Sequence, residues 1–594
     1  MDLAMDVVDF LTKNALRALG TSILLLVLVT IVYVSYSLFV YPSRCSVRHV
    51  PGPARDDLLY GNMQRVLDDE PGVVHTQWQE EYGGAVRYHG ILGGQRLVLF
   101  DPTALNHVLL SKCYSYPKPE EVRGDLEMIL GRGVLFAEGE DHRRQRRILQ
   151  PAFSPARIRE LTPTFFEHAY RLRTIWTEMI ERNEDDDKAF ASPEAATGYR
   201  KTKREGEVTL DIMPWLSRVA LDIIGMTSFG YDFGSLERSN DALADAFLNM
   251  FVPHAVAKRP TPRDLLLKRT FGILVRYLPV LKFARYVPIE RVQNITRMFE
   301  TLEGESRKII ASKQGMIEKE GMDSLKGSKD LIALLLKSAS DDAKMKLTDE
   351  ELRGQLTTFA IAGHETGSVI LTWTLWTLSE RLDVQQWLRD EIRQAKRAAQ
   401  VDGNDEIESD ALHALPYLDA VMREMLRLEA PVSATMRQTS HDDVIPLSKP
   451  IQHASDPSKT ISHIQVEKGQ TIFIPITAVN RSKEVFGADA DEFRPERWLG
   501  DKAHKIDGKV GVWASMLTFL AGPRSCIGYR FALLEVKAIL ATLIDAFEIL
   551  PRDPPFHVER RSDIVTRPLV VGEELLGYRM PLRIRLAKPD VPEE

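Results

Sequence analysis

Residues 519–528 read FLAGPRSCIG and run into an apolar helix predicted over 529–550. The pattern places Cys526 on a tight loop directly before a helix N-terminus, where Gly522 and Gly528 permit turns or close backbone approach. The helix dipole and the free backbone N–H groups at that end favour a thiolate. A stabilised thiolate with space above it suits an axial metal ligand. A buried structural cysteine beside two turn glycines is the alternative, but several residue types at set offsets favour the ligand.

A second informative stretch lies inside a long predicted helix. The residues TDEE at 348–351 form a capping box, and the helix is predicted to continue to about Leu382. Within it, AGHETG occupies 362–367, and each of its two glycines costs the helix about 1 kcal/mol relative to alanine. That cost predicts local distortion or the close approach of a ligand. Ordinary helix–helix packing through small residues is the alternative.

Three charged residues form a third pattern, called the charged triad below. Glu424 and Arg427 lie at spacing i, i+3 on one face of a predicted helix, a pair that carries little information alone. Farther along the chain, FRPERW at 493–498 contributes Arg497. A lone buried charge is very costly, so each of these charges needs a partner wherever the fold buries it.

These segments, in this order, resemble those of the cytochrome P450 superfamily, and FLAGPRSCIG resembles its haem-binding signature. The resemblance covers about Pro51 to Pro589. It implies a mainly α-helical fold with a small β region, in a single catalytic domain. It also implies haem b (iron protoporphyrin IX) as the cofactor and O2 as a co-substrate.

The resemblance also implies which residues contact the cofactor. In the family the cysteine of the signature is the axial ligand of the haem iron, a role carried over to Cys526. The family's Trp-x-x-x-Arg motif contacts a haem propionate and corresponds to His142 and Arg146, with histidine replacing tryptophan, which leaves the role of His142 open. The residues expected at the cofactor are Cys526, Arg524, Arg146, Arg437, Phe519, Gly522, Gly528, His142 and Gly363.

The AGHETG stretch carries the expected catalytic residues. Glu365 and Thr366 match the acid–alcohol pair that the family places beside its oxygen site, and we expect them to relay protons from water. Gly367 departs from the usual Thr or Ser, which would widen the groove. His364 falls at a variable position and is not interpreted as a metal ligand. The resemblance also implies that Glu424, Arg427 and Arg497 are buried and paired with one another, and that this charged triad has a structural role, holding the loop that carries Cys526.

The N-terminal region predicts a membrane anchor. Residues 19–41 are uncharged and rich in Leu, Val and Ile, and about 20 such residues span a bilayer. A secretory signal peptide is the alternative, although its apolar core is shorter, about 7–15 residues. Positive residues follow the span, which places the catalytic domain in the cytosol. We expect a single pass through the endoplasmic reticulum membrane, with a short lumenal N-terminus (1–18), a transmembrane anchor (19–41), a proline-containing hinge (42–53) and a catalytic domain (54–594).

Several other segments carry local expectations. Alternating apolar and polar residues around two glycines predict a β-hairpin over 86–100. A basic helix is expected to open at His142 and to end near Pro151. The remaining expectations are a loop at 117–133, a polar surface insert at 183–207, a helix over 210–233, helical pieces broken by prolines at 244–295, and a polar linker at 315–329.

The composition excludes several classes of function. Hydrophobic residues make up 44% of the chain and charged residues 27%, as in an ordinary globular protein. The net charge of −7 gives no reason to expect nucleic acid as a partner. The three cysteines include no C-x-x-C pair, so neither a zinc site nor a disulfide framework is supported.

The sequence favours a haem-thiolate monooxygenase that inserts one oxygen atom of O2 into a lipophilic organic substrate. No flavin or nicotinamide fingerprint occurs in the chain, so electrons are expected from NADPH through a separate NADPH-cytochrome P450 reductase, with cytochrome b5 as an optional second partner. One alternative is a haem-thiolate isomerase or dehydratase that acts on peroxides without external electrons. A lesser alternative is a non-enzymatic membrane haem protein. Fatty acids, terpenoids, polyketides and xenobiotics all remain open as substrates.

Overall fold

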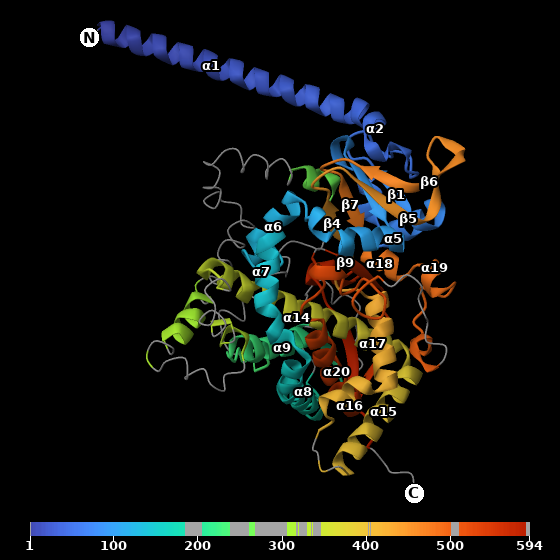
Figure 1. Cartoon of the computed structure of the whole chain (residues 1–594). Coiled ribbons are helices and arrows are strands. Elements are labelled where there is room, and N and C mark those ends of the chain that lie inside the picture. The colour runs from blue at the N-terminus through green and yellow to red at the C-terminus, as the bar shows by residue number, and fades with distance from the viewer. Residues whose placement is uncertain are drawn as a thin grey trace.

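The computed structural model describes residues 2–184, 205–237, 261–267, 306–315, 330–333, 335–336, 346–401, 406–500, 510–562 and 564–589, with the single positions 304, 319 and 403. Figure 1 shows a helical body, a smaller region above it that contains most of the long strands, and the helix α1 projecting away from that region. Long helices and short strands confirm the predicted mainly α-helical fold with a small β region.

The helices are α1 (Asp2–Ser35), α2 (Tyr41–Arg44), α3 (Met63–Asp68), α4 (Val73–Tyr82), α5 (Pro102–Asn106), α6 (Glu120–Leu130), α7 (Gly139–Leu149), α8 (Pro155–Glu181), α9 (Ile212–Ile224), α14 (Asp349–Glu380), α15 (Leu382–Val401), α16 (Ser409–Ala414), α17 (Pro416–Leu428), α18 (Ile476–Asn480), α19 (Lys483–Phe486) and α20 (Tyr529–Ala546). The strands are β1 (Ala85–His89), β2 (Gln95–Leu99), β3 (Glu207–Asp211), β4 (Thr435–Gln438), β5 (Asp443–His453), β6 (Asp456–Val466), β7 (Thr471–Ile474), β8 (Phe547–Leu550), β9 (Val558–Ser562), β10 (Thr566–Val570) and β11 (Pro581–Leu586).

The largest sheet within these ranges has the strand order β1-β2-β7-β4. β1 and β2 are antiparallel, with Ala85 opposite Leu99, which confirms the hairpin predicted over 86–100. β7 pairs parallel with β2 and antiparallel with β4. At the hairpin turn Gly93 has a φ of +77°, and a Cβ there would lie 2.1 Å from the carbonyl oxygen of Ser37. Only glycine therefore fits where this turn meets the N-terminal helical segment.

Helix α14 runs through the helical body (Figure 1). Its capping box is formed as predicted, because the Thr348 hydroxyl accepts from the Glu351 N–H and the Glu351 carboxylate accepts from the Thr348 N–H. α9 packs along α14, and α20 packs against both α8 and α14. One contact of the α8–α20 interface is the edge-to-face pair of Phe165 and Phe531. This packing brings the AGHETG stretch of α14 and the loop before α20 to the same interior.

The prediction of a loop over 117–133 is wrong for most of this range, because helix α6 occupies Glu120–Leu130. Pro119 precedes the first turn, and the acidic side chains in that turn interact favourably with the helix dipole. Gly131, with a φ of +68°, ends the helix. The prolines and glycines that suggested a loop therefore mark the ends of a helix.

The helix predicted over 210–233 is confirmed only in part. Residues 207–211 form strand β3, which pairs with β11 near the C-terminal end of the chain, with Leu210 opposite Leu582.

The predicted basic helix is present as α7, although it begins at Gly139, before His142. The insert at 183–207, the pieces at 244–295 and the linker at 315–329 lie mostly outside the described residues, although 262–267 are described and are helical as predicted.

Helix α1 is continuous through the boundary expected between residues 18 and 19. The helical segment Gly20–Arg44 is long and apolar enough to cross a membrane by length and composition, and it is almost entirely exposed. Residues of the expected hinge pack on the body, where Val47 and Val50 are buried. The Pro51 carbonyl accepts from the Arg87 N–H of β1 at 2.9 Å, which ties this segment to the sheet.

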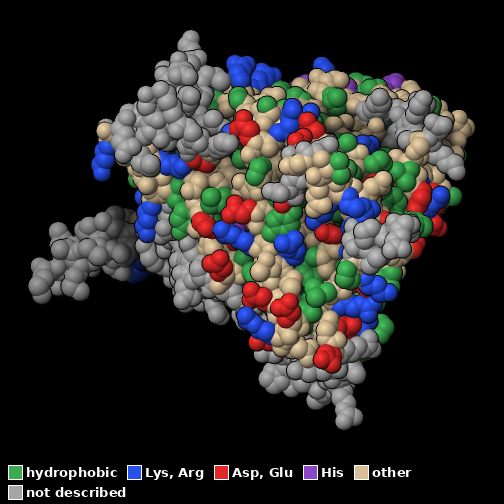
Figure 2. All heavy atoms as spheres, turned by 90° about the horizontal axis from the view of Figure 1, so that it is seen from below, with side chains coloured by type: hydrophobic (Ala, Val, Ile, Leu, Met, Phe, Trp, Pro, Cys, Tyr) green, Lys and Arg blue, Asp and Glu red, His purple; other side chains and the backbone are tan. Residues whose placement is uncertain are grey.

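Figure 2 shows the molecule from below, on the side away from α1. Lys and Arg side chains are interspersed there with Asp and Glu side chains and with apolar patches. The described part of this face therefore has no large field of one sign, in agreement with the modest net charge of −7.

Candidate functional site

The loop that carries Cys526 is held by its own backbone. The Cys526 N–H donates to the Phe519 carbonyl at 2.9 Å, and the Ser525 N–H donates to the Gly522 carbonyl at 3.0 Å. Gly522 has a φ of +68°, and a Cβ there would lie 2.3 Å from the Leu109 carbonyl oxygen. Gly522 is therefore required by the turn and by the neighbouring chain, and it does not line the cavity described next.

Cys526 faces a cavity of about 2430 Å³. Cys526 is an exposed residue that lines this cavity. Burial raises the pKa of the thiol, while the N–H of Gly528 and the charge of Arg146 oppose the shift. Phe519 also lines the cavity and packs edge-to-face on Trp513.

Cationic side chains gather along one part of the cavity. The predicted residues Arg146, Arg437 and Arg524 all line it, and Lys118 joins them. Glu138 forms ion pairs with Arg524 and, at 2.7 Å, with Lys118. Arg437 is buried and has no carboxylate partner among the described residues, and burial together with the charge of Arg524 lowers its pKa to about 10. The cluster therefore has excess positive charge that an anionic group would neutralise.

His142, which replaces the usual tryptophan, belongs to the same cluster. Its Nδ1 lies 3.1 Å from the Tyr114 hydroxyl. Burial and the charges of Arg524 and Lys118 lower its pKa to about 4, so the ring is neutral at physiological pH. Tyr114 is in turn stacked between Arg143 and Arg524, at 4.1 and 4.8 Å from its ring centroid. Sequence patterns gave no signal for Tyr114.

The acid–alcohol pair of α14 lines the cavity, but both groups are engaged. The Glu365 carboxylate accepts from Arg567 Nη2 at 2.5 Å and lies 3.3 Å from His364 Nε2. Burial alone would raise the pKa of Glu365, but Arg567 and His364 outweigh it and lower the pKa to about 2. The Thr366 hydroxyl donates to the Ala362 carbonyl at 2.7 Å. Glu365 is thus an ionised partner of Arg567, a contact that the sequence did not predict.

The two glycines of AGHETG have different surroundings. A Cβ on Gly363 would lie 2.3 Å from the Ile224 side chain of α9, so close helix packing explains this glycine although it also borders the cavity. A Cβ on Gly367 would instead lie 3.3 Å from Glu535 Oε2 of α20. The packing alternative therefore holds for Gly363, whereas Gly367 faces a buried carboxyl group.

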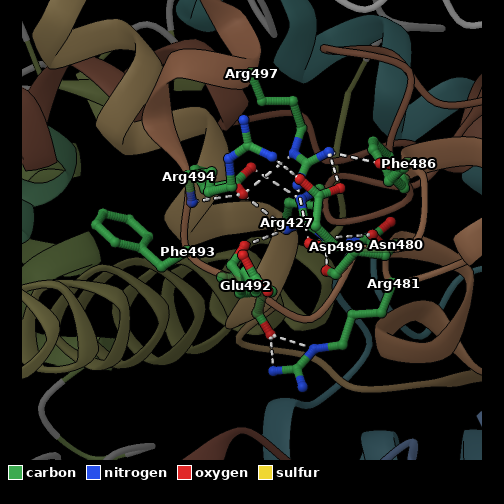
Figure 3. Close-up of polar contacts among 12 residues, drawn as sticks. Arg427, Asn480, Arg481, Phe486, Asp489, Glu492, Phe493, Arg494 and Arg497 are labelled. Carbon is green, nitrogen blue, oxygen red and sulfur yellow. Dashed lines mark hydrogen bonds and ion pairs between the residues drawn. The ribbon is translucent and has the colours of Figure 1, made fainter.

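The structure brings the charged triad together, and Figure 3 shows two of its members, Arg427 and Arg497, among their polar contacts. Glu424 and Arg427 are fully buried and form two hydrogen bonds, from Arg427 Nε at 2.9 Å and from Nη2 at 2.8 Å. Arg497 Nε lies 3.3 Å from the Glu424 carboxylate. Trp498 Nε1 also donates to Glu424 at 2.8 Å, and Asp489 pairs with Arg497 at 3.1 Å. Every member of the triad therefore has charged and neutral partners.

Asn480 connects this network to the cysteine loop. Its carbonyl accepts from Arg427 at 3.2 Å, and its side-chain oxygen accepts from the Leu517 N–H at 2.8 Å. Its amide nitrogen donates to Thr518 Oγ1 at 2.8 Å, directly before Phe519. The sequence did not single out Asn480, because nothing near it in the chain signals the contact.

The site fits haem by three observations. Cys526 lines the cavity, and cationic side chains outnumber carboxylates in the cluster beside it. The cavity volume of about 2430 Å³ exceeds the roughly 300–1,000 Å³ typical of a site for one small ligand.

Gly528 borders the cavity with an ordinary φ of −91°, and a Cβ there would meet only Phe153, at 3.6 Å. A mainly helical body with this site therefore fits a protein that holds haem.

Comparison with known proteins assigns the family. The family model for Cytochrome P450 matches residues 51–570. The chain is 37% identical to Cytochrome P450 monooxygenase 205 of Postia placenta, over 91% of this chain and 93% of the relative. It is 35% identical to Cytochrome P450 monooxygenase claO of Ampulloclitocybe clavipes, over 90% and 92%. The chain belongs to the cytochrome P450 family and is an oxidoreductase, a cytochrome P450 monooxygenase, whose family holds haem and uses O2 as co-substrate.

Proposed function

We propose that this chain inserts one oxygen atom of O2 into a lipophilic organic substrate, with electrons from NADPH delivered by a separate reductase. The observation that carries the proposal is the cysteine sulfur of the family's signature facing a large cavity. In this proposal Cys526 would hold the haem iron through its sulfur, and haem bound there would supply the oxygen-activating chemistry. Arg146, Arg437, Arg524 and His142 bind the propionates.

The lining of the cavity supports a lipophilic substrate. Residues of two segments, 432–435 and 564–567, contribute to it. Further apolar residues, such as Phe359 and Ile370 of α14, also line it. The cavity extends to Tyr36 and Tyr41, which belong to the C-terminal part of the candidate membrane segment Gly20–Arg44. A substrate dissolved in the membrane would therefore reach the site without crossing water.

The membrane anchor and its topology belong to the same proposal. The helical segment from Gly20 to Arg44 spans the endoplasmic reticulum membrane once, and the arginines that follow it keep the catalytic domain in the cytosol. NADPH-cytochrome P450 reductase, and optionally cytochrome b5, then meets the chain on that side. The exposed residues Arg143 and Arg147 of α7 offer positive charge to an acidic partner.

Turnover in isotope-labelled O2 tests the proposal. The purified full-length protein is combined with NADPH and reductase, and fatty acids, terpenoids, polyketides and xenobiotics are screened by the change in haem absorption when they bind. We expect a product that contains one labelled oxygen atom and that forms only with NADPH. Product from a lipid hydroperoxide without NADPH would instead identify an isomerase or dehydratase. Failure to consume NADPH with every compound would identify a non-enzymatic haem protein.

A further inference from the structure

His142 and Tyr114 form a hydrogen-bonded pair in which one ring faces the cavity and the other stands outside its lining. His142 is 3% exposed and lines the cavity. Tyr114 does not line it, and its hydroxyl lies 3.1 Å from His142 Nδ1. The two nitrogens of an imidazole ring point in different directions, so Nε2 is the nitrogen that remains for a group bound in the cavity.

The direction of this hydrogen bond decides which nitrogen of His142 carries the proton. The ring is neutral at physiological pH, so one nitrogen is protonated and the other is bare. His142 Nδ1 is the only hydrogen-bond partner of the Tyr114 hydroxyl within the described part of the chain. If Nδ1 carried the proton, the hydroxyl would be the acceptor, and its own hydrogen would lack an acceptor there. The hydroxyl therefore donates to a bare Nδ1, and the proton of His142 is on Nε2.

The ring of Tyr114 is held in place by cations. The guanidinium groups of Arg143 and Arg524 lie 4.1 and 4.8 Å from its centroid, within the range of cation–π attraction. Arg524 is itself fixed, because it donates to the Cys113 carbonyl and pairs with Glu138. The stacking depends on the ring and not on the hydroxyl, so the position of Tyr114 and its hydrogen bond can be tested separately.

The position of the proton matters because histidine stands here in place of the tryptophan that is usual in the family. The indole N–H of tryptophan is always a donor. A neutral histidine donates toward the cavity only if Nε2 is protonated, since a bare Nε2 would turn its lone pair toward an anionic group. Histidine can therefore replace tryptophan at this position only if one tautomer is selected.

We propose that Tyr114 fixes the tautomer of His142 with the proton on Nε2, so that this histidine donates a hydrogen bond to a haem propionate, as the family's usual tryptophan does. Tyr114 is a positioning residue, because it acts through His142. The proposal rests on the function proposed above, in which His142 binds a propionate.

Nitrogen NMR of the haem-loaded full-length protein in detergent, reduced and bound to carbon monoxide so that the iron is diamagnetic, tests the tautomer. With isotope-labelled histidine, the signals that disappear in His142→Phe belong to His142. We expect a protonated Nε2 and a bare Nδ1 in the wild type. In Tyr114→Phe, which keeps the ring between the two arginines but lacks the hydroxyl, the Nδ1 signal should move. A protonated Nδ1 in the wild type, or an Nδ1 signal that stays in place in Tyr114→Phe, would overturn the proposal.

Haem retention tests the consequence, measured as the rate of haem transfer to apomyoglobin. Tyr114→Phe should lose haem on the order of 5-fold faster than the wild type, which corresponds to one net hydrogen bond. The same substitution should have no effect when it is combined with His142→Phe, which removes the ring nitrogens, or with His142→Trp, because an indole N–H needs no tyrosine to keep its proton. An equal effect of Tyr114→Phe in all three backgrounds would show that Tyr114 acts through its own packing and would overturn the proposal.

The tautomer and the cofactor role of His142 fail in different ways. If His142→Phe loses haem faster than the wild type but Tyr114→Phe does not, His142 binds the cofactor without help from Tyr114, and only the tautomer proposal is overturned. If neither variant loses haem faster, the role proposed above for His142 fails as well. Neither measurement uses turnover, so a failure of the monooxygenase reaction would leave both results unchanged.

Discussion

The charged triad and the cavity beside Cys526 differ in whether their buried polar groups have partners. In the triad, the Glu424 carboxylate receives hydrogen bonds from Arg427 and Trp498 and an ion pair from Arg497. At the cavity, Arg437 has no carboxylate partner among the described residues, and Glu535 has an oxygen with no hydrogen bond there. A fully paired network stabilises the fold, whereas incomplete pairing marks the surface where a ligand completes the contacts.

Removing one member of the triad should have the largest effect, and it tests whether the fully paired network stabilises the fold. Glu424→Ala leaves Arg427 buried without its carboxylate, and breaking such a pair typically costs about 3–5 kcal/mol. We expect apoprotein or aggregate, measured as the yield of haem-loaded protein and the urea midpoint of unfolding. Glu484→Ala is the matched control, because Glu484 is exposed and its ion pair with Lys449 lies at the surface, where such pairs contribute little to stability. Equal losses in both variants would refute the distinction.

Gly522 and Gly528 of the cysteine loop differ in the same way, because the fold requires the first and the cavity borders the second. Gly522→Ala forces a side chain into a left-handed conformation against the Leu109 carbonyl, and strain of this kind costs about 1–3 kcal/mol. Gly528→Ala meets only ordinary contact with Phe153, so its free energy of unfolding without haem should stay near that of the wild type. Its haem retention should fall, since Gly528 borders the cavity. A stability loss in Gly528→Ala as large as that in Gly522→Ala would mean that both glycines serve the fold.

Arg437→Ala is the smallest of these perturbations. Because Arg437 has no carboxylate partner among the described residues, its removal leaves no buried anion behind, and stability without haem should not fall. A lost hydrogen bond to a charged group is worth about 1.5–3 kcal/mol, so haem should bind about 10-fold more weakly or worse, measured by transfer to apomyoglobin. Arg497→Ala is the contrasting variant, since it removes one ion-pair partner from each of the carboxylates of Glu424 and Asp489. If Arg437→Ala lowers the stability of the protein without haem, Arg437 stabilises the fold as the triad residues do.

The sequence predicted those elements that are determined by residues close to one another in the chain. The capping box at Thr348 located α14, and the alternation around Gly93 located the first hairpin. The triad contacts could be predicted because a buried charge needs a partner. Pro119 and Gly131 misled the interpretation, since the same residue types end helices and form loops.

The rest of the site depends on contacts between distant residues. Arg567 lies 202 positions after Glu365, and only the folded chain shows that it holds the carboxylate. Glu535 occupies an ordinary position of an apolar helix, and its burial without a partner follows from how α20 packs on α14. β3 was missed for the same reason, because its partner β11 is near the other end of the chain.

The absorption spectrum of the reduced protein with carbon monoxide tests most directly that the cavity beside Cys526 is a haem-thiolate site. The wild type should show the band characteristic of thiolate ligation, and Cys113→Ser should keep it, because Cys113 is buried away from the cavity lining. Cys526→His should lose this band and absorb as a histidine-ligated haem. A thiolate band that persists in Cys526→His, or that is lost in Cys113→Ser, would contradict the assignment of Cys526 as the ligand.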